Sequence, residues 1–391
     1  MQQSYDVENG LDALIKRISA LKAKVDRPII VNIAGGSGSG KSGIVAAHAA
    51  RSFAGESILI TIDDYLKGNK FLSAEIAKGR DLNFDHPEHF DIELLAGQLR
   101  ELKDSKAIDK PVFSFKAQER VGSEKVEPAN VIIVEGIYAL HEQVAKLADV
   151  RVFVDTSPHG RTARRLARDL KRTAWTPSFI IEYMGTVLER MYSQHVAPTK
   201  GFADIMIVNE FTPLKETLVW EHREVQLKFG VGKRFRLPDA LDAQLVSQSM
   251  QEDNYYSSSS ADLKGSDEMV RIRSEGGQKI FTYKGPRLGS DFITRANITF
   301  PIDAKAEAGI RSLYGRHILS IMKERLVYKT GTGMDLCIDQ NVTKSEGEKI
   351  RILGDFLNAR VPFGKEQSLR ELQKSLGVDD STLVDESYYN M

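Results

Sequence analysis

The chain has 391 residues, of which 41% are hydrophobic and 28% charged, so it is long enough for two or three globular domains and lacks the composition of a disordered or fibrous protein. Lys+Arg and Asp+Glu both total 54, and this balance argues against a nucleic-acid binder that works by gross charge. The single cysteine, Cys337, excludes an intrachain disulfide, and no stretch approaches the ~18 apolar residues that span a bilayer, so we expect a cytoplasmic protein with neither nucleic-acid nor membrane partners.

Apolar residues recur at helical spacing near the N-terminus. They run from Leu11 through Leu14 and Ile18 to Leu21, with polar residues between them. Such a pattern predicts an amphipathic helix with one face on a neighbouring domain. We therefore expect residues 1–26 to be a lead-in helix.

Short apolar runs then alternate with helical patterns. The runs are residues 29–33, 58–62, 131–134 and 150–154. Near-continuous apolar strands separated by helices are typical of a parallel sheet that is covered on both faces. Residues 27–213 are therefore expected to form an α/β domain with flanking helices.

A glycine-rich run follows the first of these strands and precedes a helical pattern. It comprises Gly35, Gly36, Ser37, Gly38, Ser39, Gly40, Lys41 and Ser42. Glycines at this spacing let consecutive backbone N–H groups surround a phosphate chain, while lysine adds a charge and serine a hydroxyl for Mg²⁺. A plain strand-to-helix turn is the alternative, but the context favours a P-loop that binds a nucleoside triphosphate.

Acidic residues stand at the ends of two further strands. Asp63 and Asp64 follow one apolar run, and Glu135 ends another. Side chains at these positions project from the carboxyl edge of a parallel sheet, beside the phosphate loop. Each could by itself be an ordinary cap of a helix or turn. Together with the P-loop they predict a Mg²⁺ site made by Ser42, Asp63 and Glu135.

Several motifs follow one another over residues 27–209. They read IAGGSGSGKS, TIDDY, NFDHPEHFD, VIIVEGIYAL, FVDTSPHGRTARRLARD and PTKGFAD. In order and spacing they resemble the uridine kinase and phosphoribulokinase family. The resemblance implies a P-loop fold, ATP as donor, a small hydroxylated acceptor, and Asp63 as the base that deprotonates the acceptor hydroxyl. It also implies that Asp85 holds sugar hydroxyls and that Arg165 and Arg168 lie on a lid over the transferring phosphate.

One stretch departs from the pattern of that family. Uridine kinases usually carry a Tyr-Asp-Phe run followed by a His that reads the pyrimidine, but this chain has Phe113-Ser114-Phe115 and Gln118. Phe113 is then the candidate for contacting the acceptor at this place. We expect the phosphate chemistry of the family, with an acceptor that need not be uridine.

Two other interpretations of charged residues are weaker. Asp85, His86, His89 and Asp91 could pass for a metal cluster, but they fall in a loop at no diagnostic spacing. The arginines of FVDTSPHGRTARRLARD could be a solvated helix face or a nucleic-acid patch, but a kinase needs cations at its closing lid.

The pattern changes after about Pro213 to alternating runs separated by turn residues. Two pairs of such runs flank glycine-containing turns: residues 269–273 with 279–284, and residues 323–328 with 334–339. Such pairs predict β-hairpins. Residues 217–364 are therefore expected to form an antiparallel β domain, and residues 365–391 an amphipathic helix with a polar end.

Basic residues on these strands share faces, because alternate residues of a strand point the same way. The stretch EVQLK at residues 224–228, the YKG and LGDF motifs and the basic pairs of the later strands resemble the CYTH family of triphosphate tunnel proteins. The resemblance implies an eight-stranded antiparallel barrel whose basic side chains bind phosphate: Lys228, Arg271, Arg273, Lys284, Lys323 and Arg325. A barrel with these charges on its solvent face is the alternative.

Carboxylates with which that family holds a divalent metal are replaced here. Gln226 replaces the middle acid of an E-x-E-x-K pattern, and Asn297 and Asn358 occupy positions where acids are expected. Arg360 ends a segment that normally carries another acid. Each replacement removes negative charge at a metal site. We therefore expect this domain to bind a phosphorylated ligand or to regulate the kinase, without efficient hydrolysis.

Three functions remain open at this point. The preferred one is a kinase dependent on Mg²⁺ and ATP, with a nucleoside or other small polyol as acceptor and with Lys41, Asp63, Arg165 and Arg168 in catalysis. The second is a phosphohydrolase that cleaves a pyrophosphate or triphosphate in either domain. The third is a non-catalytic nucleotide sensor. The kinase family also leaves a homo-oligomer open.

Overall fold

The computed structural model describes residues 3–80, 82–172, 175–210, 223–233, 235–258, 262–287, 293–331, 333–362, 364–378, 382–384, 387–389 and 391. Contacts divide the chain into two compact units. The first comprises Met1–Arg165 and Thr186–Phe211, and the second comprises Leu166–Gly185 and Thr212–Met391. The chain therefore enters the second unit, returns to the first, and then enters the second again.

The first unit is built on a parallel sheet. Within the described residues this sheet has six strands, in the order β1-β8-β7-β2-β6-β3. They are β1 (Gln3–Asp6), β2 (Ile29–Gly35), β3 (Ser57–Thr61), β6 (Val131–Glu135), β7 (Val150–Asp155) and β8 (Ile205–Val208). The four predicted strands are thus confirmed as β2, β3, β6 and β7. Two short strands were not predicted: β1 at the edge of the sheet, and β8 beside it. β1 reads QSYD, which has no apolar run.

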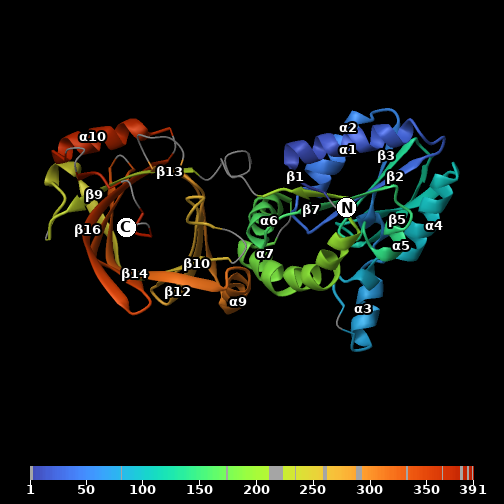
Figure 1. Ribbon diagram of the computed structural model, residues 1–391. Helices are drawn as coiled ribbons and strands as arrows, with labels where there is room; N and C mark the ends of the chain where they lie inside the picture. The colour runs from blue at the N-terminus through green and yellow to red at the C-terminus, as the bar shows by residue number, and fades with distance from the viewer. Residues whose placement is uncertain are drawn as a thin grey trace. The chain divides into compact units, whose positions relative to one another are not determined.

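Helices cover both faces of this sheet (Figure 1). Along β2, Ile30 packs with residues of α4 (Ile92–Lys103) and α5 (Glu142–Ala145), whereas Ile29 and Val31 pack with residues of α1 (Val7–Lys22) and α2 (Ala47–Ser52). Successive residues of a strand point to opposite faces, so one apolar strand contributes side chains to the core on each face of the sheet. The sheet therefore holds the carboxyl ends of its central strands rigidly at one edge.

Further elements of the first unit lie outside the sheet. A separate antiparallel hairpin is formed by β4 (Ile108–Ser114) and β5 (Glu119–Val126). The remaining helices that begin in this unit are α3 (Asn69–Ala77), α6 (Pro158–Arg172) and α8 (Glu189–Met191). Helix α6 crosses from the first unit into the second after Arg165.

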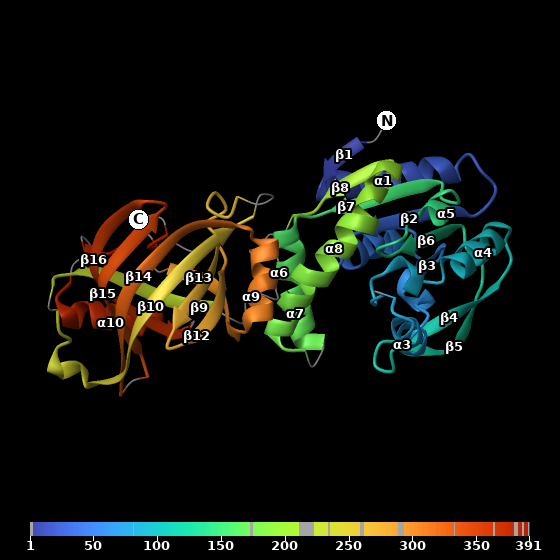
Figure 2. The same ribbon diagram turned by 90° about the horizontal axis from the view of Figure 1, so that it is seen from below.

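The second unit contains a closed antiparallel barrel with the strand order β10-β11-β12-β13-β9-β16-β15-β14 (Figure 2). The strands are β9 (Arg223–Val231), β10 (Ala243–Ser257), β11 (Met269–Glu275), β12 (Gln278–Lys284), β13 (Ile293–Ile302), β14 (Arg316–Thr330), β15 (Asp335–Glu346) and β16 (Lys349–Pro362). Gly276 and Gly277 have φ values of 55° and 79°, as a two-residue hairpin turn requires. The predicted hairpin between β11 and β12 is therefore confirmed.

The barrel wall carries apolar residues on its outer face under α10 (Glu366–Leu376), and several charged residues on its inner face. Alternate residues of β9 pack with Leu369 and Leu372 of α10, which lies on the outside of the barrel. On β14, Met322 is 52% exposed whereas Lys323 is 2% exposed. Because successive strand residues point to opposite sides, the buried cation faces the interior.

Two helices of the second unit meet at a pair of glycines. Helix α7 (Pro177–Tyr183) packs on α9 (Ala304–Leu313), and Gly185 follows α7. A Cβ on Gly185 would lie 2.3 Å from the carbonyl oxygen of Gly309, and a Cβ on Gly309 would lie 2.9 Å from that of Ile181. The two backbones approach each other this closely because neither glycine has a side chain.

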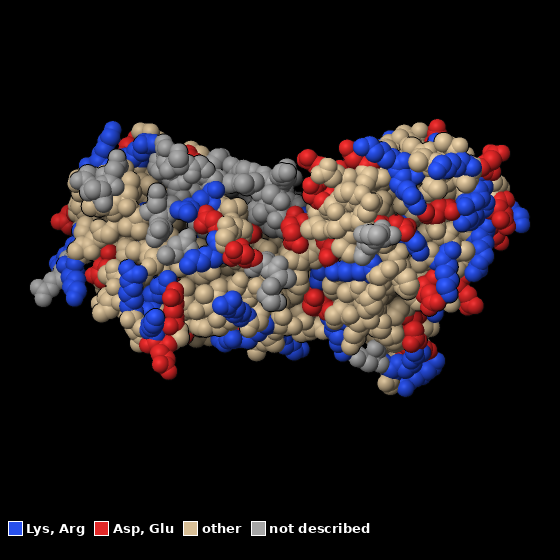
Figure 3. Space-filling view, viewed as in Figure 1, with Lys and Arg blue, Asp and Glu red and all other residues tan. Residues whose placement is uncertain are grey.

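Basic and acidic side chains are interspersed over the face of the molecule in Figure 3, as the zero formal net charge leads one to expect. Among the described helices, none is both long enough and apolar enough to cross a bilayer.

The glycine contact between α7 and α9 predicts a local packing defect. We expect Gly185→Ala to lower the free energy of unfolding by roughly 1–3 kcal/mol, because the added methyl meets backbone atoms that cannot move aside singly. Gly97→Ala is the matched control, since a Cβ at this position in α4 meets nothing within 4 Å. It should stabilise the protein by roughly 0.5–1 kcal/mol. Urea unfolding of both variants measures the difference, and equal stabilities would contradict the assigned contact.

Candidate functional site

The glycine-rich loop lies between β2 and the helical turn Lys41–Ala46. Gly38 and Gly40 have φ values of 82° and 87°. A Cβ on Gly38 would lie 2.6 Å from the carbonyl oxygen of Arg161, and a Cβ on Gly40 would lie 2.3 Å from Nδ2 of Asn209. Both positions therefore need glycine for the backbone conformation and for the close approach of neighbouring groups.

Buried hydrogen bonds fix this loop to residues that follow the carboxyl ends of β7 and β8. The carbonyl oxygen of Ser39 accepts from Nδ2 of Asn209 at 2.7 Å and from Oγ1 of Thr156 at 3.2 Å. Arg164 donates to the carbonyl oxygen of Asn209 at 2.9 Å. The loop is thus held before any ligand binds, which reduces the entropy lost on binding.

A carboxylate at the end of β6 links the loop to β3. Oε2 of Glu135 accepts from Oγ of Ser42 at 2.6 Å, and Oε1 accepts from Oγ1 of Thr61 at 2.9 Å. Glu135 is 7% exposed. The ends of β3 and β6 and the start of the helix after the loop therefore meet at one carboxyl group.

Asp63 lies beside this group, directly after β3. Burial raises the pKa of Asp63 to about 6; the charge of Lys41 opposes this effect, and the charges of Glu135, Asp85 and Asp64 add to it. The structure therefore brings four of the predicted residues, Lys41, Asp63, Asp85 and Glu135, into one electrostatic environment. A carboxyl group with such a pKa is ionised at neutral pH and remains a stronger base than an exposed aspartate.

The neighbouring Asp64 points to the β4–β5 hairpin instead. Its carboxylate forms an ion pair with the buried ammonium of Lys110 and accepts from the backbone N–H of Phe113 at 3.3 Å. Lys110 also contacts Glu124 at 2.9 Å. Phe113 is therefore tied to the segment that carries Asp63. The sequence did not predict Lys110, because a single lysine in a strand gives no signal of its distant partner.

The loop that carries Asp85 is fixed through its backbone. The hydroxyl of Tyr138 donates to the carbonyl oxygen of Asp85 at 2.5 Å. Within the same loop, His89 is buried among aromatic rings and contacts the carbonyl oxygen of Gly68 at 3.0 Å. Asp91 caps α4 and pairs with Arg120. Among the residues described, no group of three or more His, Cys, Asp or Glu could hold a metal ion.

The predicted lid arginines differ in their surroundings. Nη1 of Arg165 donates to Oγ of Ser37 in the phosphate loop at 2.8 Å. Nη1 of Arg161 donates to the carbonyl oxygen of Thr156, and the central carbon of its guanidinium lies 3.7 Å from the centre of the Tyr192 ring. Arg168 pairs with its neighbour Asp169 and belongs to the second unit, so its place over the phosphate stays a prediction.

The residues at the carboxyl edge suit a hard cation. Ser42, Asp63 and Glu135 offer a hydroxyl and two carboxylates, and oxygen ligands of this kind are those that Mg²⁺ prefers. Ser42 and Glu135 are already in hydrogen-bonding contact, and the charges of Glu135 and Asp63 act on each other. The donor set is therefore consistent with the predicted magnesium site.

A second group of predicted residues lies inside the barrel. Lys228, Arg273, Lys323 and Arg325 are at most 9% exposed, and the side chain of Arg271 is 13% exposed. Lys284 is half-buried at the end of β12. The alternative in which these charges lie on a solvent face is therefore wrong for the buried members. The side chain of Glu224 lies outside the described residues.

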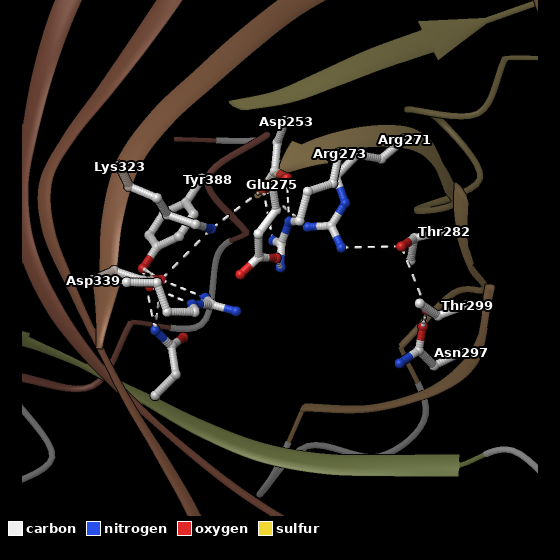
Figure 4. Close-up of polar contacts among 12 residues, drawn as sticks. Asp253, Arg271, Arg273, Glu275, Thr282, Asn297, Thr299, Lys323, Asp339 and Tyr388 are labelled. Carbon is white, nitrogen blue, oxygen red and sulfur yellow. Dashed lines mark hydrogen bonds and ion pairs between the residues drawn. The ribbon is translucent and has the colours of Figure 1, made fainter. Parts of the chain in front are cut away.

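Two carboxylates that the sequence did not single out as charge partners pair with these cations. Asp253 accepts from Arg273 at 2.6 and 2.9 Å, from Arg271 at 3.0 Å and from Lys323 at 3.2 Å (Figure 4). Asp339 accepts from both Nε and Nη2 of Arg325 at 2.6 Å. Burial alone raises the pKa of Asp253, but the charges of Arg271, Lys323 and Arg273 hold it well below its ordinary value.

The C-terminal tail also reaches this interior. The hydroxyl of Tyr388 donates to Oδ2 of Asp339 at 2.7 Å, and Tyr388 is 7% exposed. Residues 366–376 form the predicted helix. The expected polar end beyond it stays a prediction, but Tyr388 and Tyr389 in that end are buried. Their neighbours are distant in the sequence, so the local pattern gave no sign of this.

Two family models match the chain. The Phosphoribulokinase / Uridine kinase family matches residues 30–213, and the CYTH domain matches residues 222–388. These matches cover the two parts of the chain that the sequence motifs had assigned to the same two families.

Curated relatives match one or both of these parts. A uridine kinase of Lactobacillus johnsonii is 46% identical over 187 residues, which are 46% of this chain and 86% of that protein. A uridine kinase of Lactobacillus helveticus is 41% identical over 193 residues, 48% of this chain and 89% of that protein. Inorganic pyrophosphatase TTM2 of Arabidopsis thaliana is 27% identical over 333 residues, 83% of this chain but only 46% of that protein.

The ion pairs inside the barrel predict a large loss of stability on removal of one partner. Asp253→Asn should lower the free energy of unfolding by about 3–5 kcal/mol, because Arg271 and Arg273 would remain buried without this counter-ion and Lys323 would keep, among the described carboxylates, only Asp339, at 3.7 Å. Asp335→Asn is the control. Asp335 is half-exposed, and its carboxylate lies 4.0 Å from Nζ of Lys329, which is the limit for an ion pair. Its substitution should change the free energy of unfolding by no more than ~0.5 kcal/mol.

The destabilisation by Asp253→Asn should also depend on pH. The pKa of Asp253 is lower in the folded chain than the ordinary value of 3.8, so the carboxylate contributes its stability above that value and loses it as the pH falls below it. Urea unfolding of the wild type and of the variant should therefore give converging stabilities in acid. A difference that stays constant through the acidic range would contradict the assignment.

Proposed function

Because the chain belongs to the phosphoribulokinase/uridine kinase family over residues 30–213 and carries a CYTH domain over residues 222–388, we propose that it transfers the terminal phosphoryl group of ATP to a hydroxyl of a nucleoside or a similar small molecule. The observation that carries the proposal is the meeting of Ser42, Glu135 and Asp63 beside the phosphate loop. Phosphoryl transfer requires such a combination of a phosphate cradle, a metal site and a base.

The phosphate loop binds the donor. Backbone N–H groups from Gly35 to Ser42 surround the β and γ phosphates, and the ammonium of Lys41 neutralises part of their charge. Arg165 already contacts Ser37 of the loop, so its guanidinium is near enough to the cradle to stabilise charge on the transferring phosphoryl group. These groups bind more strongly as charge develops in the transition state, which is the condition for catalysis.

Asp63 orients and deprotonates the acceptor hydroxyl. Asp85 contributes a second carboxylate on the acceptor side, and the hairpin fixed through Asp64 and Lys110 presents Phe113 to the acceptor. The ring of Phe113 is 8% exposed and packs in the core, so the small apolar part that can meet the acceptor reads none of its polar groups. This is consistent with an acceptor other than uridine.

Mg²⁺ would be held by Ser42, Asp63 and Glu135 and would neutralise charge on the β and γ phosphates. Oε2 of Glu135 accepts a hydrogen bond from Oγ of Ser42, so these two residues are in contact.

For the barrel we propose binding of a condensed phosphate without efficient hydrolysis. The buried cations outnumber the buried carboxylates, and Nε of Arg271 has no hydrogen-bond partner among the described residues. A buried donor without a partner is costly, so an anion that accepts from it would gain affinity. Asn358 stands in place of an acid and already donates to Asp339, which leaves fewer carboxylates to hold a metal.

The alternatives are a phosphohydrolase in either unit and a nucleotide sensor. The Arabidopsis relative is an inorganic pyrophosphatase, and this similarity favours hydrolysis as the second candidate. A hydrolase releases phosphate without an acceptor, whereas a kinase shows only slow leakage and a sensor binds ATP without turnover. Product analysis with and without a panel of nucleosides and sugars separates the three.

The role of Asp63 predicts a selective loss of turnover. Asp63→Asn should retain ATP binding and lower kcat by roughly 10²–10⁴-fold, because an amide cannot accept the proton of the acceptor hydroxyl. ADP formation with the best acceptor of the panel gives kcat, and calorimetry gives ATP affinity. Asp12→Asn, on the exposed face of α1, is the control and should change neither quantity. Undiminished turnover in Asp63→Asn would remove the assignment of the base.

The barrel predicts little metal-dependent hydrolysis of its own. Lys41→Met removes the cation of the phosphate loop, so any triphosphatase activity of the full-length variant must come from elsewhere. We expect phosphate release from tripolyphosphate with Mg²⁺ or Mn²⁺ to remain at background, because few carboxylates are left to hold the metal. Vigorous metal-dependent release by this variant would overturn the proposal and favour the hydrolase.

A further inference from the structure

The C-terminal tail forms part of the barrel wall. β13 pairs with Arg223 to Gln226 of β9. Further along β9, Leu383 of the tail forms a bridge with Phe229, and the backbone N–H of Val384 donates to the carbonyl oxygen of Lys228 at 2.8 Å. The tail therefore takes the position of a neighbouring strand where the described register of β13 has ended.

Hydrogen bonds and ring contacts hold the end of the tail in place. The ammonium of Lys344 donates to the carbonyl oxygen of Tyr389 at 3.2 Å, and the ring of Tyr389 stacks on Tyr255 with centroids 5.2 Å apart. The ring of Tyr388 lies 5.0 Å from that of Phe356. These contacts belong to an apolar cluster of the barrel, so both tyrosines are fixed parts of its interior.

Tyr388 covers two of the cations that the barrel presents to its interior. Nζ of Lys228 lies 4.5 Å from the centre of its ring, and Nζ of Lys323 lies 4.9 Å from it. A cation so close to the face of an aromatic ring is attracted to it. The hydroxyl of the same tyrosine donates to Asp339 and accepts from Nδ2 of Asn358 at 3.2 Å. An anion that is to reach Lys228 and Lys323 must therefore displace a side chain that makes four polar contacts.

Another pair of cations lies away from Tyr388. Figure 4 shows Arg271 with Thr282 across the interior from the group of Tyr388, Lys323 and Asp339. Nη2 of Arg271 donates to Oγ1 of Thr282 at 3.1 Å, and Asp253 accepts from both Arg271 and Arg273. Nε of Arg271, which has no hydrogen-bond partner within the part of the chain that the structure describes, also belongs to this group. Among the described residues, the interior thus has two lysines against the ring of Tyr388, Arg325 paired with Asp339, and two arginines paired with Asp253.

We propose that Tyr388 is a specificity-determining residue of the barrel, which covers Lys228 and Lys323 and so restricts the site to short condensed phosphates held by Arg271 and Arg273. This inference rests on the anion binding proposed for the barrel. Pyrophosphate can be held by the two arginines alone. A longer chain must place further phosphoryl groups against the ring of Tyr388, whose carbon face donates no hydrogen bond to replace their lost hydration.

Calorimetric titration tests the proposal in the full-length Lys41→Met protein, in which the phosphate loop no longer competes. Pyrophosphate and tripolyphosphate are titrated without metal. We expect Tyr388→Ala to raise the ratio of the affinity for tripolyphosphate to the affinity for pyrophosphate at least tenfold. Tyr388→Phe keeps the ring over both lysines and is the matched control; its ratio should stay within threefold of the parent. Tyr388→Leu retains side-chain volume and carries the same expectation as Tyr388→Ala if that variant does not fold.

The outcomes separate this inference from the function on which it rests. An unchanged affinity ratio in a folded Tyr388→Ala or Tyr388→Leu variant overturns the role of Tyr388, and so does an equal gain for both anions. Absence of binding for both anions in every variant overturns the anion role of the barrel itself. Loss of both affinities in Arg271→Ala, together with the shifted ratio in Tyr388→Ala, supports the proposal in full.

Discussion

The interior of the barrel depends on the ion pairs that the carboxylates of Asp253 and Asp339 form with its buried basic side chains. Five cations lie there buried or nearly so, and isolated charges of this kind cannot be taken out of water without counter-ions. Asp253 engages three of them and Asp339 engages two. The positive excess that remains makes the interior suited to an anion, while the pairing keeps the empty barrel stable.

Much of the first unit could be predicted from the sequence because its signals are local. The run from Gly35 to Ser42 encodes its own conformation, and Asp63 and Glu135 follow apolar strands whose carboxyl ends meet in any parallel sheet. The anchoring of Arg164 on Asn209 and of Lys110 on Asp64 could not be predicted. Both join segments that lie 45 or more residues apart, and no periodicity records such a pairing.

The barrel was predicted in outline for the same reason. Alternation along β11 and β12, with Gly276 and Gly277 between them, fixes a hairpin and places its basic residues on one face. The partners of those residues depend on how the barrel closes. The residues around Asp253 in its strand form no pattern that marks it as a counter-ion. Tyr388 contacts Asp339 across 49 residues of chain. Sequence patterns therefore gave the cations but neither their counter-ions nor the aromatic ring that covers them.

The contact between Gly185 and Gly309 bears on how the protein can be dissected. The kinase family matches residues 30–213, yet Leu166–Gly185 packs with the unit that contains the barrel. A fragment truncated between the two family matches would deprive α7 of α9 and leave the apolar faces of both helices uncovered. The two parts of this chain are thus unsuited to separate expression along the borders of the family matches, because those borders divide helices that pack on each other.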